Sequence, residues 1–282
     1  MYFQECYRYL CAYGDYQECE FAIFGVPYDG TTTYKPGARF GPDGIRRASW
    51  VLETYSPYLR RDLTEVEIAD LNNIIVEGDQ REILNRIYRA TINLMRDGKK
   101  VVIIGGDHSI TYAPVRAAKE VYGDIVLVHF DAHCDLREEY LGNRYSHASV
   151  IRRCYEITED IYQFGVRSGD REEWEFAWRN TNISSRLPEE EDIERIGSLD
   201  KPIYITVDID VLDPAYAPGT GTPEPCGCSS KEFIEALYLF RDLRDKIVGF
   251  DVVEVSPPWD VNDITSITAA KIIRELILTV AR

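Results

Sequence analysis

Six short, mainly apolar runs constrain the fold of this chain more than any other feature. They cover residues 21–24, 74–76, 101–104, 125–128, 203–207 and 247–253, and a weaker seventh covers 161–166. A run that stays apolar, in place of alternating with polar residues, is typical of a strand covered on both faces, as in a parallel sheet. The sequence therefore predicts a mostly parallel central sheet.

Helical patterns lie between these runs. Apolar residues recur every three or four positions in residues 79–96, 230–243 and 267–280, and Ser229 or Ser230 is a suitable N-cap for the second of these segments. Strands that alternate with helices predict an α/β fold, here a three-layer sandwich around the sheet. No linker interrupts the alternation, so we expect a single domain over residues 1–282. Residues 1–20 are rich in Tyr and Phe and are expected to pack on the core or on a neighbouring subunit.

Composition narrows the class of protein. The formal net charge of −16 argues against nucleic acid and anionic membranes as partners, and it suits a small cationic substrate. No apolar stretch approaches the roughly 20 residues of a membrane helix, and the N-terminus lacks the pattern of a signal peptide. We therefore expect a cytoplasmic protein with reduced thiols, including Cys226 and Cys228, which are too close in sequence for an unstrained disulfide.

Acidic and imidazole side chains follow the predicted strands. Ligands bind beyond the carboxyl ends of strands in open α/β sheets, so these side chains are candidates for one common site. In the segment 131–135, alternate positions share one face of an extended strand. The candidates that follow four different strands are His108, then Asp131, His133 and Asp135, then Asp208 and Asp210, and finally Glu254.

The charge of this set predicts two metal ions. Asp131, Asp135, Asp208 and Asp210 carry four negative charges, which two divalent cations would balance. Carboxylate and imidazole ligands without a thiolate favour Mn²⁺ over a structural zinc site. A salt-bridged loop is the alternative for any one of these segments, but it does not explain all four strand ends together.

Several spaced motifs resemble those of a known family. They are residues 36–43, 105–109, 131–135, 208–214, 218–224, 254–258 and 269–271, and they occur in the family's order. The chain resembles the ureohydrolase (arginase/agmatinase) family over roughly residues 20 to 280, and within it the agmatinase branch. The resemblance implies an arginase-like fold and two Mn²⁺ per subunit.

The resemblance also implies a set of metal ligands. One metal would take His108, Asp131, Asp135 and Asp208. The other would take His133 and Asp210, and it would share Asp131 and Asp208. A hydroxide between the metals would attack the guanidinium carbon of the substrate.

The remaining roles also rest on the resemblance. Glu254 would pair with the guanidinium group, and Thr222 would steady Glu254. Asp210 would stabilise the intermediate and help to protonate the leaving amine, and His147 matches the proton-shuttling histidine of the family.

The loop at residues 136–146 should read the far end of the substrate. Its Glu138 and Glu139 are expected to accept a cationic amine, and Arg137 stands where the arginase branch grips an amino-acid head group. The expected reaction is therefore the hydrolysis of agmatine to urea and putrescine. Aminopropylagmatine, guanidinobutyrate and arginine are alternative substrates.

An enzyme of another class, a zinc-dependent amide deacetylase, is a further alternative. The second histidine and the fourth carboxylate disfavour it. Family members assemble as trimers or hexamers, so a homo-oligomer is expected.

Other polar residues near the motifs are expected to have structural roles. His129 stands two residues before Asp131 and could face the same side, but it is interpreted as a packed strand residue, because it lies inside the sheet. Asp107 and Asp213 are expected to accept backbone hydrogen bonds and shape their loops. Arg46 and Arg47 follow a turn and are expected on the surface of a helix.

Overall fold

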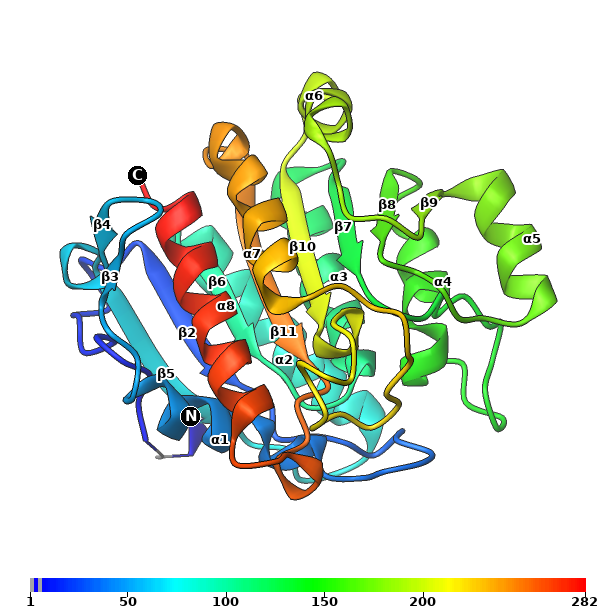
Figure 1. Ribbon diagram of the computed structural model, residues 1–282, viewed down its shortest axis with the longest axis horizontal. Coiled ribbons are helices and arrows are strands. Elements are labelled where there is room, and N and C mark those ends of the chain that lie inside the picture. The colour runs from blue at the N-terminus through cyan, green and yellow to red at the C-terminus, as the bar shows by residue number, and fades with distance from the viewer. Residues whose placement is uncertain (1–2, 5–6) are drawn as a thin grey trace.

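A nine-stranded sheet forms the centre of the computed structural model, which describes residues 3–4 and 7–282 (Figure 1). The strands lie in the order β1-β5-β2-β6-β11-β10-β7-β8-β9. All neighbours pair in parallel except β1, which is antiparallel to β5 at one edge. The strands are β1 (Phe3–Gln4), β2 (Phe21–Gly25), β5 (Ile68–Ile74), β6 (Lys100–Ile104), β7 (Val126–Phe130), β8 (Ile161–Phe164), β9 (Asn182–Ser184), β10 (Ile203–Asp208) and β11 (Ile247–Val253). A separate small hairpin joins β3 (Tyr55–Ser56) to β4 (Arg61–Asp62).

Helices cover both faces of the sheet. In Figure 1, α1, α7 and α8 lie in front of the strands, whereas α2 and α3 lie behind them. The helices are α1 (Gly41–Ser49), α2 (Gln80–Arg96), α3 (Tyr112–Tyr122), α4 (Val150–Tyr155), α5 (Arg171–Asn180), α6 (Glu190–Ser198), α7 (Ser230–Tyr238) and α8 (Ile264–Val280). The predicted three-layer α/β sandwich is confirmed.

Each face of the sheet has its own apolar core. Val102 and Ile104 of β6 point into the core beneath α1, α7 and α8, and Val101 and Ile103 point into the core beneath α2 and α3. All four side chains are fully buried. This is why the strands remain apolar along their whole length in the sequence.

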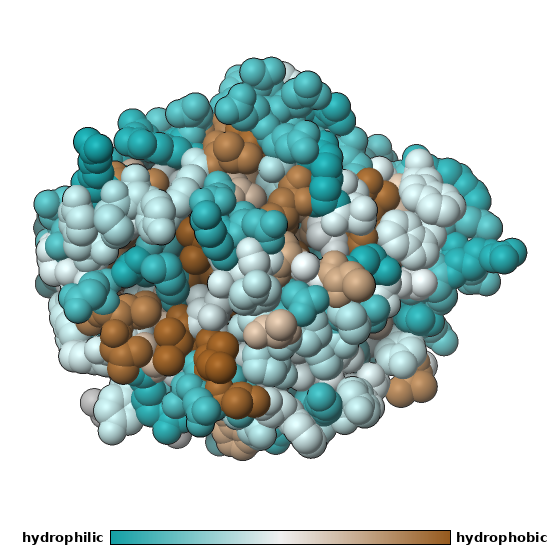
Figure 2. Space-filling view, viewed as in Figure 1, coloured by the Kyte–Doolittle hydropathy of each residue, from teal (hydrophilic) through white to brown (hydrophobic). Residues whose placement is uncertain are grey.

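The surface is mainly hydrophilic on the face drawn in Figure 2, in keeping with the acidic composition. Apolar side chains gather there around the first turn of α8. Val261 and Ile264, just before and at the start of that helix, keep 52% and 42% of their surface exposed. None of the described helices is long and apolar enough to span a membrane.

Helix starts follow local capping chemistry. Asp79 accepts the N–H of Glu82 and caps α2, where the sequence placed the beginning of a helix. Ser229 and Glu232 form a reciprocal capping box that begins α7, so the predicted cap is confirmed. The segment 230–243 ends differently from the prediction, because its last five residues, Leu239–Leu243, form a 3₁₀ turn.

One strand was predicted in the wrong place. Residues 74–76 were expected to form a strand, but β5 covers Ile68–Ile74 and shares only its last residue with that range. The sequence signal failed because Asp70 and Asn73 of this strand are polar, although both are buried.

Arg46 explains why β5 tolerates these polar residues. Its guanidinium is fully buried and donates from Nε and Nη2 to the two oxygens of Asp70, at 2.8 and 2.9 Å, and from Nη1 to Asn73 Oδ1. The expectation that Arg46 lies on a helix surface is therefore wrong, whereas Arg47 is exposed as expected. A helix and a strand thus satisfy each other's buried polar groups.

The described part of the N-terminal segment packs on this core. Tyr9 is fully buried, its backbone N–H donates to Asp70 Oδ2 (2.8 Å), and its hydroxyl donates to the carbonyl of Ala270 in α8 (2.6 Å). The segment therefore connects β5 to α8. The carboxyl ends of β6, β7, β10 and β11, which are neighbours in the sheet, all lie at one edge.

Candidate metal centre

Side chains from three strand ends meet around His108. This histidine begins the 3₁₀ turn after β6, Asp131 and Asp135 follow β7, and Asp208 ends β10. The carboxylate oxygens that face Nδ1 of His108 are Oδ2 of Asp131 (3.0 Å), Oδ2 of Asp135 (3.3 Å) and Oδ2 of Asp208 (3.2 Å). Atoms that bind one cation at about 2.1 Å stand about 3 Å apart when their bonds are perpendicular, so this spacing suits a shared metal ion.

A second cluster adjoins the first. Nδ1 of His133 lies 3.1 Å from Asp210 Oδ2 and 3.4 Å from Asp131 Oδ1. Asp131 therefore directs one oxygen into each cluster, as a carboxylate that bridges two cations would do. The structure brings together all six residues expected as metal ligands.

The turns after β7 and β10 are shaped by the aspartates themselves. Asp131 Oδ1 accepts the N–H of His133 (2.6 Å), and Asp208 Oδ1 accepts the N–H of Asp210 (2.9 Å). Asp210 Oδ1 in turn accepts the N–H of Ala132 from the neighbouring loop (3.1 Å). Asp135 adopts a left-handed backbone conformation, with φ of 52°, which Asp adopts more readily than most other residues.

Hydrogen bonding leaves one atom of His108 for a cation. Nε2 of His108 lies 2.9 Å from the hydroxyl of Thr206, and that hydroxyl donates to Asp251 Oδ1 (2.5 Å). Thr206 must therefore accept a proton from Nε2, which puts the lone pair of the ring on Nδ1. Among the described residues Nδ1 is buried without a hydrogen-bond partner. An orphaned buried lone pair that faces three carboxylates fits a metal ion.

The raised pKa values of two buried carboxyl groups also favour bound cations. Burial and the charge of Asp131 raise the pKa of Asp135 to about 7. Burial and the charge of Asp210 raise the pKa of Asp208 well above its usual range. Four carboxylates in such a space are not all ionised unless cations balance them. The donor set therefore fits two divalent cations.

His129 contacts this centre, which the sequence interpretation missed. It is fully buried in β7 as expected, but its Nε2 lies 2.8 Å from Asp131 Oδ2. Gln163 Nε2 donates to Nδ1 of His129 (3.0 Å), which puts the ring proton on Nε2 and makes it a donor to Asp131. The sequence did hold a signal, because residues 129 and 131 share one face of the strand.

Glu254 lies beside the metal centre on the loop after β11. Its carboxylate is buried, accepts the backbone N–H of His108 at Oε1 (2.8 Å), and sits on a residue with a left-handed φ of 65°. Thr222 was expected to steady Glu254, but its hydroxyl instead donates to Asp210 Oδ2 (3.4 Å). The contact that steadies Glu254 therefore comes from the main chain of His108.

The two acids expected to read the substrate's far end differ in their surroundings. Glu138 forms ion pairs with Arg144, Arg152 and Arg153, at 2.9 to 3.2 Å. These charges hold the pKa of its carboxyl below its usual value, although slight burial opposes them. Arg144 and Arg153 also pair with Glu156. Glu138 therefore stands in a cluster of arginines, and its role toward a cationic amine stays a prediction. Glu139 is exposed beside it.

Two acids near the site shape loops, as the sequence predicted. Asp107 accepts the backbone N–H groups of Thr31 (2.8 Å) and Ser109 (3.1 Å), and Asp213 accepts those of Ala215 (3.0 Å) and Gly227 (3.1 Å). Asp107 also accepts the hydroxyl of Thr31, which no sequence pattern indicated.

His147 lies on a 3₁₀ turn at the rim of the site. Its ring is half-buried and packs edge-on against Tyr140, with ring centroids 6.0 Å apart. Burial lowers the pKa of His147, whereas the negative charge of Asp107 opposes this shift. The turn of His147 packs against the 3₁₀ turn that begins at His108.

Comparisons with known proteins agree with this geometry. The sequence matches the arginase family over residues 19–279. It is 38% identical to an agmatinase of Halalkalibacterium halodurans over 99% of both chains, and 38% identical to an N(1)-aminopropylagmatine ureohydrolase of Thermococcus kodakarensis over 91% of this chain and 89% of that protein. Among solved structures, agmatine ureohydrolase of Thermoplasma volcanium superposes with a TM-score of 0.88, covers 98% of this chain and 95% of its own, and is 35% identical. The chain therefore belongs to the arginase family and is a ureohydrolase, an enzyme that hydrolyses linear amidines.

Proposed function

We propose that this ureohydrolase converts agmatine to urea and putrescine with two Mn²⁺ ions. The observation that carries the proposal is the carboxylate of Asp131, which contributes one oxygen to each of two adjacent ligand clusters. Two clusters favour a pair of cations over the single zinc of the deacetylase alternative. The agmatinase relatives, which match over almost the whole length of this chain, support the choice of substrate.

His108, Asp131, Asp135 and Asp208 would hold one cation, and His133, Asp210 and the shared carboxylates of Asp131 and Asp208 would hold the other. When bound, such a pair lowers the pKa of a coordinated water and orients it for attack on an electrophilic carbon. The protein's part is to keep the ligands in place. His129 and Gln163 do this for Asp131, and Thr206 with Asp251 does it for His108.

Glu254 would hold the guanidinium group. Burial and the charge of Asp107 raise the pKa of Glu254 well above its usual range, so a cation beside it stabilises the ionised form. Oε1 already accepts the N–H of His108, which leaves Oε2 for the substrate. Gly221 keeps the space next to that oxygen open, because a Cβ at this position would stand 3.4 Å from Oε2. A carboxylate that accepts guanidinium N–H groups fixes the carbon in line for attack.

Two further side chains would handle protons. The breakdown of the tetrahedral intermediate releases an amine that must gain a proton. Asp210 would stabilise the intermediate and help to protonate this amine, and its carboxylate accepts hydrogen bonds from Ala132 and Thr222. His147 would carry protons between this site and solvent, since its ring is half-buried at the rim.

The substrate's far end would meet the loop at residues 136–146. Arg137 in that loop is engaged by Asp170 (2.7 Å) and packs over the ring of Tyr140 (5.0 Å). Glu138 is paired with arginines, so Glu139 is the acid of the loop that would attract a cationic tail more strongly. The Thermococcus relative acts, by its name, on aminopropylagmatine, which has a longer cationic tail, so this compound is the second candidate.

A urea-release panel with added Mn²⁺ tests the proposal. Agmatine, N(1)-aminopropylagmatine, guanidinobutyrate and arginine would be compared by kcat/KM at one pH and one metal concentration. We expect agmatine to have the highest value and arginine the lowest. A higher kcat/KM for arginine than for agmatine would refute the proposal that the loop at residues 136–146 favours a cationic amine tail. A higher kcat/KM for aminopropylagmatine than for agmatine would make aminopropylagmatine the proposed substrate.

A further inference from the structure

Thr31 lies on the loop after β2 and contacts the candidate proton shuttle. Its hydroxyl is 3.2 Å from Nδ1 of His147 and donates to Asp107 Oδ2 (2.9 Å). We propose that Thr31, oriented by Asp107, is the positioning residue that fixes the tautomer of His147. The inference rests on the proposed function for the role of His147, but the geometry of the contact is independent of the substrate.

The direction of each hydrogen bond follows from the number of protons available. The Thr31 hydroxyl has one proton, which goes to the carboxylate of Asp107. Its oxygen accepts the backbone N–H of His147 (3.0 Å) and has one lone pair left for the ring. In this contact Nδ1 of His147 must therefore be the donor. The Ser146 hydroxyl also lies near Nδ1, at 3.4 Å, but the contact with Thr31 is shorter, at 3.2 Å. Thr31 accordingly puts the ring proton on Nδ1 and leaves the lone pair on Nε2.

Asp107 is itself fixed, so the threonine has little freedom to turn. Asp107 is fully buried and accepts the N–H of Thr31 at the same oxygen that accepts the hydroxyl. Its other oxygen accepts both polar groups of Ser109. A negative charge behind the threonine stabilises the ring when Nε2 takes up a proton, because a cationic imidazole donates more strongly from Nδ1.

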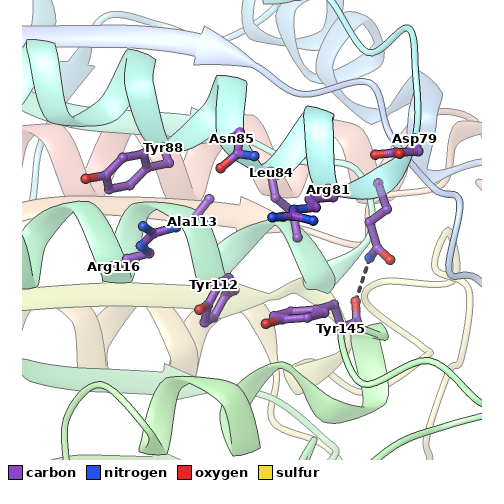
Figure 3. Close-up of a pocket in the computed structure, with 10 residues that line it drawn as sticks. Asp79, Arg81, Leu84, Asn85, Tyr88, Tyr112, Ala113, Arg116 and Tyr145 are labelled. Atoms are coloured by element: carbon purple, nitrogen blue, oxygen red, sulfur yellow. Dashed lines mark hydrogen bonds between the residues drawn. The ribbon is translucent and has the colours of Figure 1, made fainter.

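The turn that carries His147 is held from its outer side as well. Gln80, the first residue of α2, donates to the carbonyl of Tyr145 (2.6 Å) and accepts Asn143 Nδ2 (2.9 Å). Figure 3 shows the ring of Tyr145 against that of Tyr112, beside this dashed bond. The contacts fix the main chain of the turn, at the edge of a groove of about 720 Å³ along α2 and α3. The imidazole itself contacts Thr31, Ser146 and the ring of Tyr140, and Thr31 makes the shortest polar contact with Nδ1.

This arrangement determines where protons enter and leave. Nε2 carries the lone pair, so it accepts a proton from solvent and returns it to the amine that leaves the intermediate. A ring with the opposite tautomer would present an N–H that cannot accept. Loss of the Thr31 hydroxyl would therefore slow the proton transfer without changing how the guanidinium group is held by Glu254.

Kinetics of two Thr31 variants test the inference. Thr31→Val removes the hydroxyl and keeps the side-chain shape, and Thr31→Ser keeps the hydroxyl. We expect kcat of Thr31→Val to fall about 10- to 100-fold, with KM and the number of bound Mn²⁺ ions unchanged, and Thr31→Ser to restore most of kcat. Thr33→Val is the matched control, because Thr33 is exposed in the same loop, and it should leave kcat unchanged.

A second readout does not depend on turnover. The chain contains 4 histidines, so the ring nitrogens of ¹⁵N-histidine protein loaded with diamagnetic Zn²⁺ can be assigned with the help of a His147→Asn variant. We expect a proton on Nδ1 and a lone pair on Nε2 of His147 in the neutral ring, and a mixture of tautomers in Thr31→Val. The opposite tautomer in the unmodified protein, or an unchanged kcat in Thr31→Val, would overturn the inference. If no guanidino compound yields urea, the proposed function fails, and the nitrogen spectrum still decides the role of Thr31.

Discussion

Replacement of Asp70 by Asn should destabilise the protein strongly, although Asp70 lies outside the metal centre. Its carboxylate accepts Nε and Nη2 of Arg46 at 2.8 and 2.9 Å, and neither side chain is exposed to solvent. Asp70→Asn keeps the shape of the side chain but leaves the buried guanidinium charge with only the half-exposed carboxylate of Asp43, 3.9 Å away, as a counterion. Removing one partner of a buried pair costs about 3–5 kcal/mol. The change also weakens the acceptor of the Tyr9 N–H, so the N-terminal segment should loosen from the core.

Equilibrium unfolding in urea, at fixed protein and Mn²⁺ concentrations, measures this cost. Asp43→Asn is the matched control, because Asp43 lies 3.9 Å from the same guanidinium with half of its side chain exposed, and it should cost less than about 1 kcal/mol. Asp70→Leu combined with Arg46→Met removes both charges and should recover most of the lost stability. A loss below about 1 kcal/mol in Asp70→Asn would refute the assignment of a buried ion pair that holds α1 on β5.

Three further changes test the site. Glu254→Gln should lower kcat/KM for agmatine, because it costs about 2–3 kcal/mol of transition-state binding, while elemental analysis should show unchanged metal content. An unchanged kcat/KM would show that Glu254 does not bind the substrate. Asp251→Asn should weaken Mn²⁺ affinity about 10- to 100-fold through Thr206 and His108, and a calorimetric titration with unchanged affinity would contradict this route. Because burial and Asp131 raise the pKa of Asp135 to about 7, this carboxyl is protonated below that pH and must release its proton to bind a metal. Mn²⁺ affinity should therefore fall as the pH falls below about 7, and proton release should be visible by calorimetry in buffers of different ionisation enthalpy; a pH-independent affinity would contradict it.

The ligand set could be predicted from sequence because of the topology of the sheet. In a parallel sheet every strand ends at the same edge, so Asp131, Asp208 and the residues after them had to converge once the strands were recognised. The alternation along residues 131–135 then selected the side chains that share a face. These local rules place the side chains at one edge of the sheet, and the ligands meet there because β6, β11, β10 and β7 are neighbours.

The residues that hold the metal ligands, His147 and the buried strand β5 in place could not be predicted, because their partners are distant in sequence. Thr206 and Asp251 are 45 positions apart and meet only because β10 pairs with β11. Thr31 and His147 are separated by 116 positions and meet where two loops cross the site. The buried charge of Arg46 was missed for the same reason, since its partner stands in a strand that the apolar pattern did not reveal.

The number of metal ions bound per chain tests the central claim most directly. Elemental analysis of the purified protein after saturation with Mn²⁺ and removal of excess ions would be compared with that of Asp131→Ala. Since Asp131 contributes an oxygen to each cluster, we predict two ions per chain in the unmodified protein and loss of both, together with urea release, in the variant. A single tightly held ion in the unmodified protein, or two ions retained in Asp131→Ala, would contradict the assignment of a two-metal centre bridged by this carboxylate.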